Sequence, residues 1–377
     1  MKNFELFLYN YGISIFYVKI GLGFLSSFLI TFFSIPTIIK ISRRKNLMDE
    51  PSVRSSHLRK IPNLGGIAIF YSIGICTSVF AYEIFDLYKF LFASLIVLLY
   101  VGVMDDIVVM RAYKKLVAQI AVSAFIVIGS DIRIRSLFGI CGIFEINYYL
   151  SVIFTIITFI ILINAFNLID GIDGLAGGYS VICSALFGIS YYRLGEYNYP
   201  LVVLSVVIIG SVLAFLYYNL SNYRATKIFM GDTGSMLLGF LLAFTCICFI
   251  DIFIDRKLPN VPRYHLKSAP VIAVAILILP IVDTLNVILV RLWNKKSPFE
   301  ADKNHIHHKL LKLELTHRRS SFYIIVYYLL IVLVAYAFRH SNVNLLLVII
   351  LGLGFIGAYL PDIIYRMRNR NTIKTNN

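Results

Sequence analysis

Charged residues are scarce in this 377-residue chain: they make up 15% of it, whereas hydrophobic residues make up 59%. An ordinary soluble domain carries charge on about a quarter of its residues, so water is excluded as the main solvent. Cysteine is sparse too, with five residues that lie mostly inside apolar runs and show no metal-type spacing. We therefore interpret the cysteines as packing residues.

The sequence also lacks internal repeats, low-complexity tracts and long linkers. Nothing marks a second domain, so we expect residues 1–377 to form a single integral membrane domain. The formal charge of +15 is spread over short segments between apolar runs and is not gathered on one soluble face. We therefore expect a lipid bilayer and no nucleic acid among the partners. The sequence carries no signal of an oligomeric state.

Long apolar runs are what the chain has in abundance. A helix needs about 20 apolar residues to cross a hydrocarbon layer of about 30 Å. The runs predict an all-α, polytopic transmembrane bundle with about eleven spans, at 14–39, 64–82, 87–104, 115–130, 149–168, 175–193, 199–219, 234–254, 269–292, 321–338 and 342–360. Ten or twelve spans stay open as alternatives. The first run lacks a small-residue cleavage site, so we expect a retained anchor and not a signal peptide.

Lysine and arginine indicate the orientation. With the N-terminus outside and the C-terminus cytoplasmic, eleven spans place more than twice as many basic residues on the inner side as on the outer side. Reversing the orientation or deleting a middle span spoils this asymmetry. The partly alternating segment from Asp131 to Tyr148 predicts a small hairpin on the outer side.

Four groups of polar residues fall at the expected inner ends of spans, although they are far apart in sequence. They are Asp105 with Asp106, Asp170 with Asp173, Asp232, and the histidines His305, His307 and His308. Because all four are expected on one side of the bilayer, we predict that they form a single site.

Asp105 and Asp106 end the third span. Adjacent carboxylates repel each other unless a proton or a cation lies between them, and one divalent metal would satisfy both. The alternative is an exposed pair near a helix end, although carboxylates at a helix C-terminus oppose the macrodipole.

Two Asp-Gly steps interrupt the apolar sequence in NAFNLIDGIDGLAGG, residues 164–178. Glycines allow close approach of the backbone, and a loop leading into a helix N-terminus offers N–H groups to a nucleotide or sugar. If this loop is helical, Asp170 and Asp173 share a face. A plain turn with helix caps is the alternative.

Asp232 precedes the eighth span and lies between Gly231 and Gly234. An N-cap explains part of this pattern, but a carboxylate free of side-chain crowding is also a good Mg²⁺ ligand near phosphates.

The three histidines occur among many cations, which suits binding of a pyrophosphate better than a structural zinc site, since no cysteine accompanies them. In a helix, His305 and His308 share a face. Zinc held by His305, His307 and a carboxylate, or a solvated basic loop, are the alternatives.

Asp283 lies about 14 Å deep in the ninth span, counted at 1.5 Å per residue, so it needs a partner. Arg291 is two turns away on nearly the same face of the helix. Pro280 is expected to kink this helix.

In combination, these motifs resemble the polyprenyl-phosphate N-acetylhexosamine-1-phosphate transferase family, of the glycosyltransferase family 4 type, from HLRKIPNLGG through HIHHKLL. The resemblance implies an enzyme of the bacterial inner membrane whose site faces the cytoplasm. It would transfer a sugar-1-phosphate from a UDP-sugar to undecaprenyl or another polyprenyl phosphate and release UMP. The implied cofactor is Mg²⁺, with Mn²⁺ as an alternative. Transfer would proceed by direct attack of the lipid phosphate or through an aspartyl intermediate.

The resemblance also implies a role for each motif residue. Asp105, Asp106 and Asp232 are the implied catalytic residues, and Asp232 and Asp170 are the implied metal ligands. The implied substrate-binding residues are Lys115, Asn167, Asp170, Gly171, Asp173, Asn219, His305, His307 and His308.

The sequence HIHH, with SPF and Asp302 upstream, is similar to the branch that starts O-antigen, common-antigen and teichoic-acid chains. This favours a GlcNAc-1-phosphate donor, with QuiNAc, FucNAc, GalNAc and phospho-MurNAc-pentapeptide left as alternatives. Asn63 and the apolar stretch 107–109 depart from the family pattern. A transporter or lipid flippase is the competing class, but transporters usually show repeats and midplane polar sites.

Overall fold

A computed structural model describes residues 14–49, 60–254, 266–295 and 305–375 of the chain. Asp302, the SPF segment at 297–299 and Arg59 of the first family motif lie outside the described residues.

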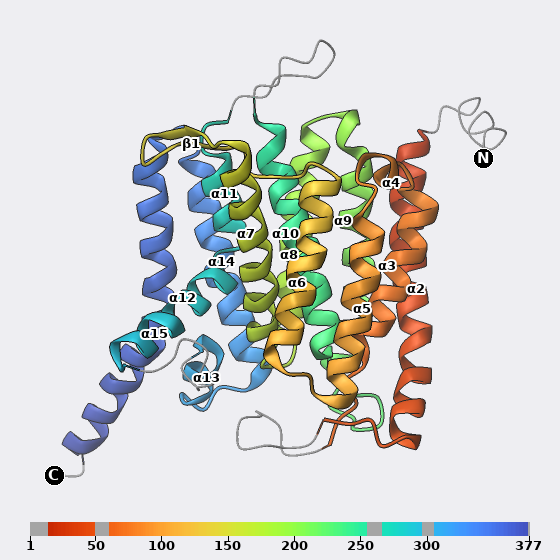
Figure 1. The fold of residues 1–377 in the computed structure, drawn as a ribbon. Coiled ribbons are helices and arrows are strands. Elements are labelled where there is room, and N and C mark those ends of the chain that lie inside the picture. Colours follow the sequence, from red (N-terminus) through yellow and green to blue (C-terminus); the bar gives the residue numbers. More distant parts are fainter. Residues whose placement is uncertain (1–13, 50–59, 255–265, 296–304, 376–377) are drawn as a thin grey trace.

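The described residues are almost entirely helical (Figure 1). The helices are α2 (Ile15–Arg44), α3 (Gly65–Phe80), α4 (Glu83–Leu87), α5 (Leu91–Val108), α6 (Ala112–Gly129), α7 (Tyr148–Ile169), α8 (Leu175–Arg193), α9 (Tyr199–Asn219), α10 (Gly231–Ile252), α11 (Ala269–Ile276), α12 (Ile278–Trp293), α13 (Ile306–Leu311), α14 (His317–Ala337) and α15 (Val343–Thr375). A 3₁₀ turn, η1 (Glu196–Asn198), precedes α9, and two strands, β1 (Ser136–Ile140) and β2 (Ile143–Glu145), complete the fold.

Each predicted span corresponds to a helix, and the all-α prediction is confirmed. Within the described ranges, nine helices are long and apolar enough to cross a membrane, and the bent pair α11–α12 makes a tenth. The predicted count of eleven also included α3, which has 16 residues and falls short of a full crossing by length. The length criterion therefore supports nine to ten spans.

The two ends of the bundle differ in what they carry. The antiparallel β1–β2 hairpin, which confirms the hairpin predicted between Asp131 and Tyr148, lies at the end opposite α13 (Figure 1). Both α2 and α15 run from the hairpin end toward the α13 end. Which end faces the cytoplasm remains a prediction.

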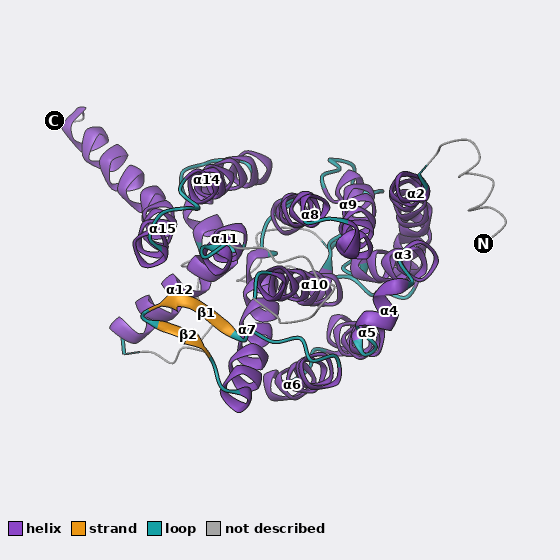
Figure 2. Ribbon diagram, turned by 90° about the horizontal axis from the view of Figure 1, so that it is seen from above, coloured by secondary structure: helices purple, strands orange, loops and turns teal. Residues whose placement is uncertain are grey.

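Helix α10 lies at the centre of the bundle, surrounded by other helices (Figure 2). Every residue from Thr233 to Ile250 is buried. A helix that is apolar on all sides is expected in such a place, because no face of it needs to meet water. The N-terminus of this central helix therefore lies deep among the elements that form the site.

The ninth predicted span is broken and not merely kinked: α11 and α12 meet at 76° around Leu277. Pro280 explains the position of the break, because its missing N–H and its ring disrupt the bond to the carbonyl of Ile276. That carbonyl instead accepts a hydrogen bond from the hydroxyl of Tyr179 at 2.7 Å. The same hydroxyl accepts one from the N–H of Leu279 at 3.2 Å, so the freed backbone groups are satisfied.

Candidate active site

The segments that precede α3 and α10 are joined through their backbones. The N–H of Phe229 donates to the carbonyl of Pro62 at 2.8 Å, and the N–H of Gly66 donates to the carbonyl of Met230 at 2.8 Å. The approach is so close that a Cβ on Gly66 would lie 2.5 Å from the Cα of Gly234. Only glycine fits there, and the joint fixes the first turn of α10.

Asp106, on α5, caps the N-terminus of α10. Its Oδ1 accepts a hydrogen bond from the N–H of Asp232 at 2.8 Å. Its Oδ2 accepts from the N–H of Thr233 at 3.0 Å and from the Thr233 hydroxyl at 2.5 Å. A carboxylate in this place satisfies free helix N–H groups and is favoured by the helix macrodipole. Through this cap Asp106 positions Asp232.

Asp105 points to different partners. Its Oδ1 accepts a hydrogen bond from the N–H of Met110 at 2.6 Å, and its Oδ2 forms an ion pair with Lys115. The Nζ of Lys115 also lies 2.6 Å from Oδ2 of Asp232. The expectation of one cation between Asp105 and Asp106 is therefore wrong: the two carboxylates diverge, and the ammonium of Lys115 bridges Asp105 and Asp232.

Asn167, near the end of α7, completes the surroundings of Asp232. Its Nδ2 donates to Oδ1 of Asp232 at 3.0 Å and to the hydroxyl of Ser235 at 2.9 Å. About one turn away, the amides of Gln119 and Asn164 exchange hydrogen bonds at 2.7 and 3.2 Å and tie α6 to α7. Both helices that bring polar groups to Asp232 are thus held together beside it.

Asp170 lies in the turn between α7 and α8, which is not helical, so the face that it was expected to share with Asp173 does not exist. Its carboxylate has no hydrogen bond or ion pair within the described part of the chain. Burial, reinforced by the negative charges of Asp232, Asp106 and Asp173, raises the pKa of Asp170 well above its usual value. A nearby cation would relieve this repulsion.

Asp173 anchors the same turn to its neighbours. Its Oδ2 lies 2.5 Å from Nζ of Lys227 and 3.6 Å from Nδ1 of His317, and the hydroxyl of Ser321 donates to its carbonyl at 2.8 Å. Burial opposes ionisation, but the interactions with His317 and Lys227 outweigh it and hold the pKa of Asp173 below its usual value. Sequence reasoning missed Lys227 and His317; the only signal was that each lies near a recognised motif.

Asn219, at the end of α9, fastens the turn from the other side. Its Oδ1 accepts a hydrogen bond from the N–H of Gly174 at 2.8 Å, and its Nδ2 donates to the carbonyl of Ile228 at 3.0 Å. Gly174 has a positive φ of 80° and is the N-cap of α8, which is why glycine is favoured there. Asn219 therefore shapes the two loops that border the site.

The three histidines lie in and just before the short helix α13. His305 is its N-cap and does not share a helical face with His308, contrary to the expectation. The ring centroids of His305 and His307 are 5.7 Å apart, and those of His307 and His308 are 4.3 Å apart. Burial lowers the pKa of His307 to about 3, and a Cβ on Gly171 would clash with its imidazole. Helix α13 thus packs directly on the turn after α7.

These elements surround a polar pocket of about 260 Å³. It is lined by Asp49, Asn63, Asp106, Asn167, Asp170, Gly171, Ile172, Asp173, Asn219, Phe229, Gly231, Asp232 and His308. Two site residues, Asp105 and Lys115, are not in the lining; Lys115 forms ion pairs with both Asp105 and Asp232. The lining also lacks His305 and His307, whose rings are in contact with each other, and the ring of His307 contacts that of His308. The pocket thus brings together at least one residue from each of the four predicted clusters.

A metal ion fits this pocket only if water or phosphate oxygens of a bound substrate complete its coordination. Among the described residues, no three His, Cys, Asp or Glu side chains come together as a complete protein cage. Mg²⁺ commonly takes one or two carboxylates and fills its other positions with water and phosphate oxygens. The unpaired carboxylate of Asp170, with Asp232 nearby, suits that mode of binding.

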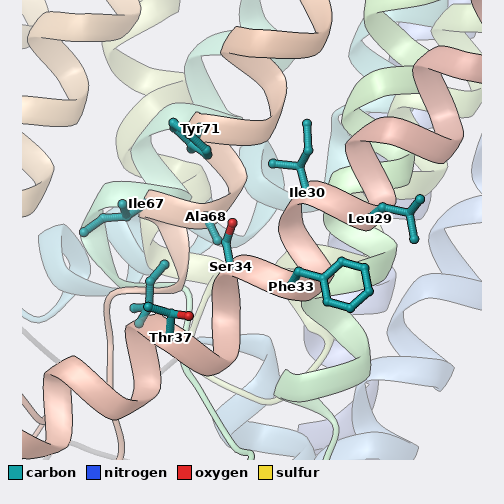
Figure 3. A pocket seen from close by; sticks show the side chains of 9 residues that line it. Leu29, Ile30, Phe33, Ser34, Thr37, Ile67, Ala68 and Tyr71 are labelled. Carbon is teal, nitrogen blue, oxygen red and sulfur yellow. The ribbon is translucent and has the colours of Figure 1, made fainter.

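A larger hollow of about 600 Å³ lies between α2 and α3 and has a different character (Figure 3). Apolar side chains such as Leu29, Phe33 and Tyr71 line it, and these three are well exposed. It holds no carboxylate or histidine, so it is unsuited to phosphoryl chemistry. Its surface matches the hydrocarbon environment expected around a membrane bundle.

Comparison with known proteins agrees with the geometry. Residues 88–250 match the model of the family described as "Glycosyl transferase family 4". The "Probable undecaprenyl-phosphate N-acetylglucosaminyl 1-phosphate transferase" of Bacillus subtilis is 31% identical over 316 residues, which cover 83% of this chain and 82% of that protein. The chain belongs to glycosyl transferase family 4.

Other relatives of this family 4 protein have similar names. The "Undecaprenyl-phosphate alpha-N-acetylglucosaminyl 1-phosphate transferase" of Haemophilus influenzae is 31% identical over 298 residues, or 78% of this chain and 80% of that protein. The "Decaprenyl-phosphate N-acetylglucosaminephosphotransferase" of Mycobacterium tuberculosis is 30% identical over 341 residues, or 86% and 82%. The family resemblance noted in the motifs is confirmed.

The matched family 4 segment contains the three acidic clusters and Lys115, Asn167 and Asn219. Helix α13 with its histidines lies beyond it, yet packs on the same pocket. The chain is thus a multi-pass membrane protein of family 4 whose polar site is assembled from both the matched segment and later residues.

Proposed function

We propose that this protein transfers GlcNAc-1-phosphate from UDP-GlcNAc to undecaprenyl or another polyprenyl phosphate and releases UMP. The observation that carries the proposal is the polar pocket lined by Asp232 and the unpaired carboxylate of Asp170, with Lys115 joining Asp232 to Asp105 at its edge. Such a pocket at one end of a membrane bundle gives a water-soluble nucleotide-sugar and a lipid phosphate a common place to meet. The names of the family 4 relatives support the choice of substrates.

Asp232 and Asp170 would hold Mg²⁺, with Mn²⁺ as the alternative, and the cation would neutralise charge on the pyrophosphate of the donor. Lys115 keeps Asp232 in place and supplies positive charge near the phosphates. The turn with Asn167, Gly171 and Asp173, clamped by Asn219, would hold the uridine end of the donor. The histidines of α13 would orient the pyrophosphate from the opposite side.

Direct transfer is the mechanism that the contacts favour. A phosphate oxygen of the lipid attacks the β-phosphorus of the donor, and the bond from this phosphorus to the bridging oxygen breaks, so UMP leaves. An aspartyl intermediate on Asp105 or Asp106 would need one of these two carboxylates to be free as the nucleophile. Both oxygens of Asp106 accept hydrogen bonds at the α10 N-terminus, and Asp105 is held by Met110 and Lys115.

The site would face the cytoplasm of a bacterial inner membrane, with the N-terminus outside, because that is where nucleotide-sugars are made. The product would start a cell-surface polysaccharide such as O-antigen, common antigen or teichoic acid. Phospho-MurNAc-pentapeptide transfer is the alternative within the family. A transporter is disfavoured because the polar residues gather at one end of the bundle and not at its middle.

A donor panel tests the proposal. Purified protein is incubated with undecaprenyl phosphate, Mg²⁺ and one of UDP-GlcNAc, UDP-GalNAc, UDP-QuiNAc, UDP-FucNAc or UDP-MurNAc-pentapeptide, and UMP release is measured. We expect the fastest release with UDP-GlcNAc. Release with the pentapeptide donor alone would move the protein to the peptidoglycan branch, and no release with any donor would refute the enzymatic function.

A further inference from the structure

Asp283 is a buried acidic residue that the proposed chemistry does not use. It lies on α12, and 1% of it is exposed. Burial of a carboxylate is costly unless hydrogen bonds and a partner compensate for the lost water. The structure provides both from one place, the start of α13.

Each carboxylate oxygen of Asp283 has its own partner. Oδ2 lies 2.8 Å from Nδ1 of His305, and Oδ1 accepts a hydrogen bond from the N–H of Ile306 at 2.8 Å. The second bond caps α13, whose N-cap residue His305 makes no side-chain cap of its own. A carboxylate oxygen accepts hydrogen bonds, so the tautomer of His305 with a hydrogen on Nδ1 is the one that fits this contact.

Three contacts connect the pair of Asp283 and His305 to the polar pocket. The rings of His305 and His307 stack, the ring of His307 lies against that of His308, and His308 lines the pocket. His307 also packs against Gly171, in the turn after α7. A shift of the first turn of α13 therefore moves the histidine wall relative to the turn after α7.

We propose that Asp283 is a positioning residue for the donor: by anchoring His305 and capping α13, it holds His308 at the pocket. It is not a catalytic residue, because it acts through α13 and does not line the pocket. The inference rests on the proposed function, in which the histidines orient the donor pyrophosphate. A displacement of about 1 Å in a positioning group can change rates or binding by about 100-fold.

The test compares Asp283→Leu, which removes both acceptors, with Asp283→Asn, which keeps an acceptor for the Ile306 N–H and a polar group for His305. We expect Asp283→Leu to raise the KM for UDP-GlcNAc about 10- to 100-fold, with kcat within about threefold of wild type. Asp283→Asn should recover most of this loss. The KM for polyprenyl phosphate should not change.

Asn286 offers a matched control. It lies one turn further along α12, is fully buried, and its amide atoms have no hydrogen-bond partner among the residues that the structure describes. Asn286→Leu therefore makes a similar polar-to-apolar change on α12 without removing a hydrogen bond to α13, and we expect wild-type kinetics. A merely destabilising effect of Asp283→Leu would lower the amount of active enzyme and leave the donor KM unchanged, which would overturn the inference.

Two further measurements keep the inference separate from folding and from the proposed function. If Asp283→Leu does not fold, the comparison of His305→Leu with His305→Asn replaces it, because Asn keeps a hydrogen-bond donor near the position of Nδ1. Equal KM values for UDP-GlcNAc in these two variants would overturn the inference.

Calorimetric titration with UDP measures binding without turnover. A UDP Kd that is the same in wild type and Asp283→Leu refutes the positioning role, whereas a wild type that binds UDP but releases no UMP refutes the transfer reaction.

Discussion

Asp106 caps α10, and variants of this residue can separate a structural role from a purely catalytic one. Asp106→Ala leaves three donors without a partner: the N–H groups of Asp232 and Thr233 and the Thr233 hydroxyl. Asp106→Asn can keep the two bonds to Thr233 if its amide oxygen takes the position of Oδ2. Thr233→Val removes only the hydroxyl donor.

The magnitudes follow from the number of bonds lost. A hydrogen bond to a charged group contributes about 1.5–3 kcal/mol. At the lower end of this range we therefore expect Asp106→Ala to lose about 5 kcal/mol of unfolding free energy, Asp106→Asn about 2 kcal/mol and Thr233→Val about 1.5 kcal/mol. Because the first turn of α10 carries Asp232, transfer activity should fall in the same order.

Thermal unfolding in detergent, followed by intrinsic fluorescence and paired with UMP release, measures both effects. The predicted order of melting temperature is wild type, Thr233→Val, Asp106→Asn and Asp106→Ala. An inactive Asp106→Ala protein that melts at the wild-type temperature would refute the cap, because it would show that Asp106 serves the chemistry alone.

Three other predictions follow from the site. Lys115→Met leaves the carboxylates of Asp105 and Asp232 facing each other without their shared cation, so kcat should fall at least about 100-fold; a loss below about tenfold in UMP release would contradict this role. His307 has a folded pKa of about 3 against 6.5 when unfolded, so it stays neutral in the fold, and its contribution to stability is complete above pH 6.5 and declines as the pH falls toward 3. Between pH 7 and pH 5 the unfolding free energy of wild type should fall by about 2 kcal/mol more than that of His307→Gln, measured by unfolding at both pH values. An equal fall in the two proteins would contradict this prediction. Cys141 is the exposed free cysteine of the hairpin, and the other four are buried, so a membrane-impermeant maleimide should label wild type but not Cys141→Ser in intact spheroplasts; labelling only after lysis would reverse the proposed orientation.

Much of the fold could be predicted because the bilayer restricts what a chain can do. Apolar runs of the required length must be helices, since no water satisfies their backbone groups. The sequence also predicted that Asp106, Asp170, Asp232 and His308 gather in one pocket. Residues at the same ends of neighbouring membrane helices lie on one side of the bilayer and therefore close together.

The choice of side-chain partners could not be predicted. Asp105 and Asp106 are neighbours in sequence, but successive residues of an α-helix point about 100° apart, so different helices provide their partners. Arg291 was the residue expected to accompany Asp283, yet the carboxylate contacts Nδ1 of His305, 22 residues along the chain. Such pairings depend on how helices pack, which local spacing does not contain.

The break between α11 and α12 shows the same limit. Pro280 predicted a kink, whereas the helix bends by 76°, and the hydroxyl of Tyr179 bonds to the carbonyl of Ile276 and the N–H of Leu279 at the break. A partner from α8 thus satisfies the backbone groups that the break leaves free. The position of the proline was visible in sequence, whereas its compensation was not.

The central claim is that the pocket around Asp232 performs transfer of GlcNAc-1-phosphate. The most direct measurement is UMP release from UDP-GlcNAc and undecaprenyl phosphate, with Mg²⁺, by wild type and Asp232→Asn, after melting curves have shown that both are folded. We predict steady release by wild type and loss of at least about 1000-fold in Asp232→Asn. A folded Asp232→Asn protein that releases UMP at the wild-type rate would contradict the account.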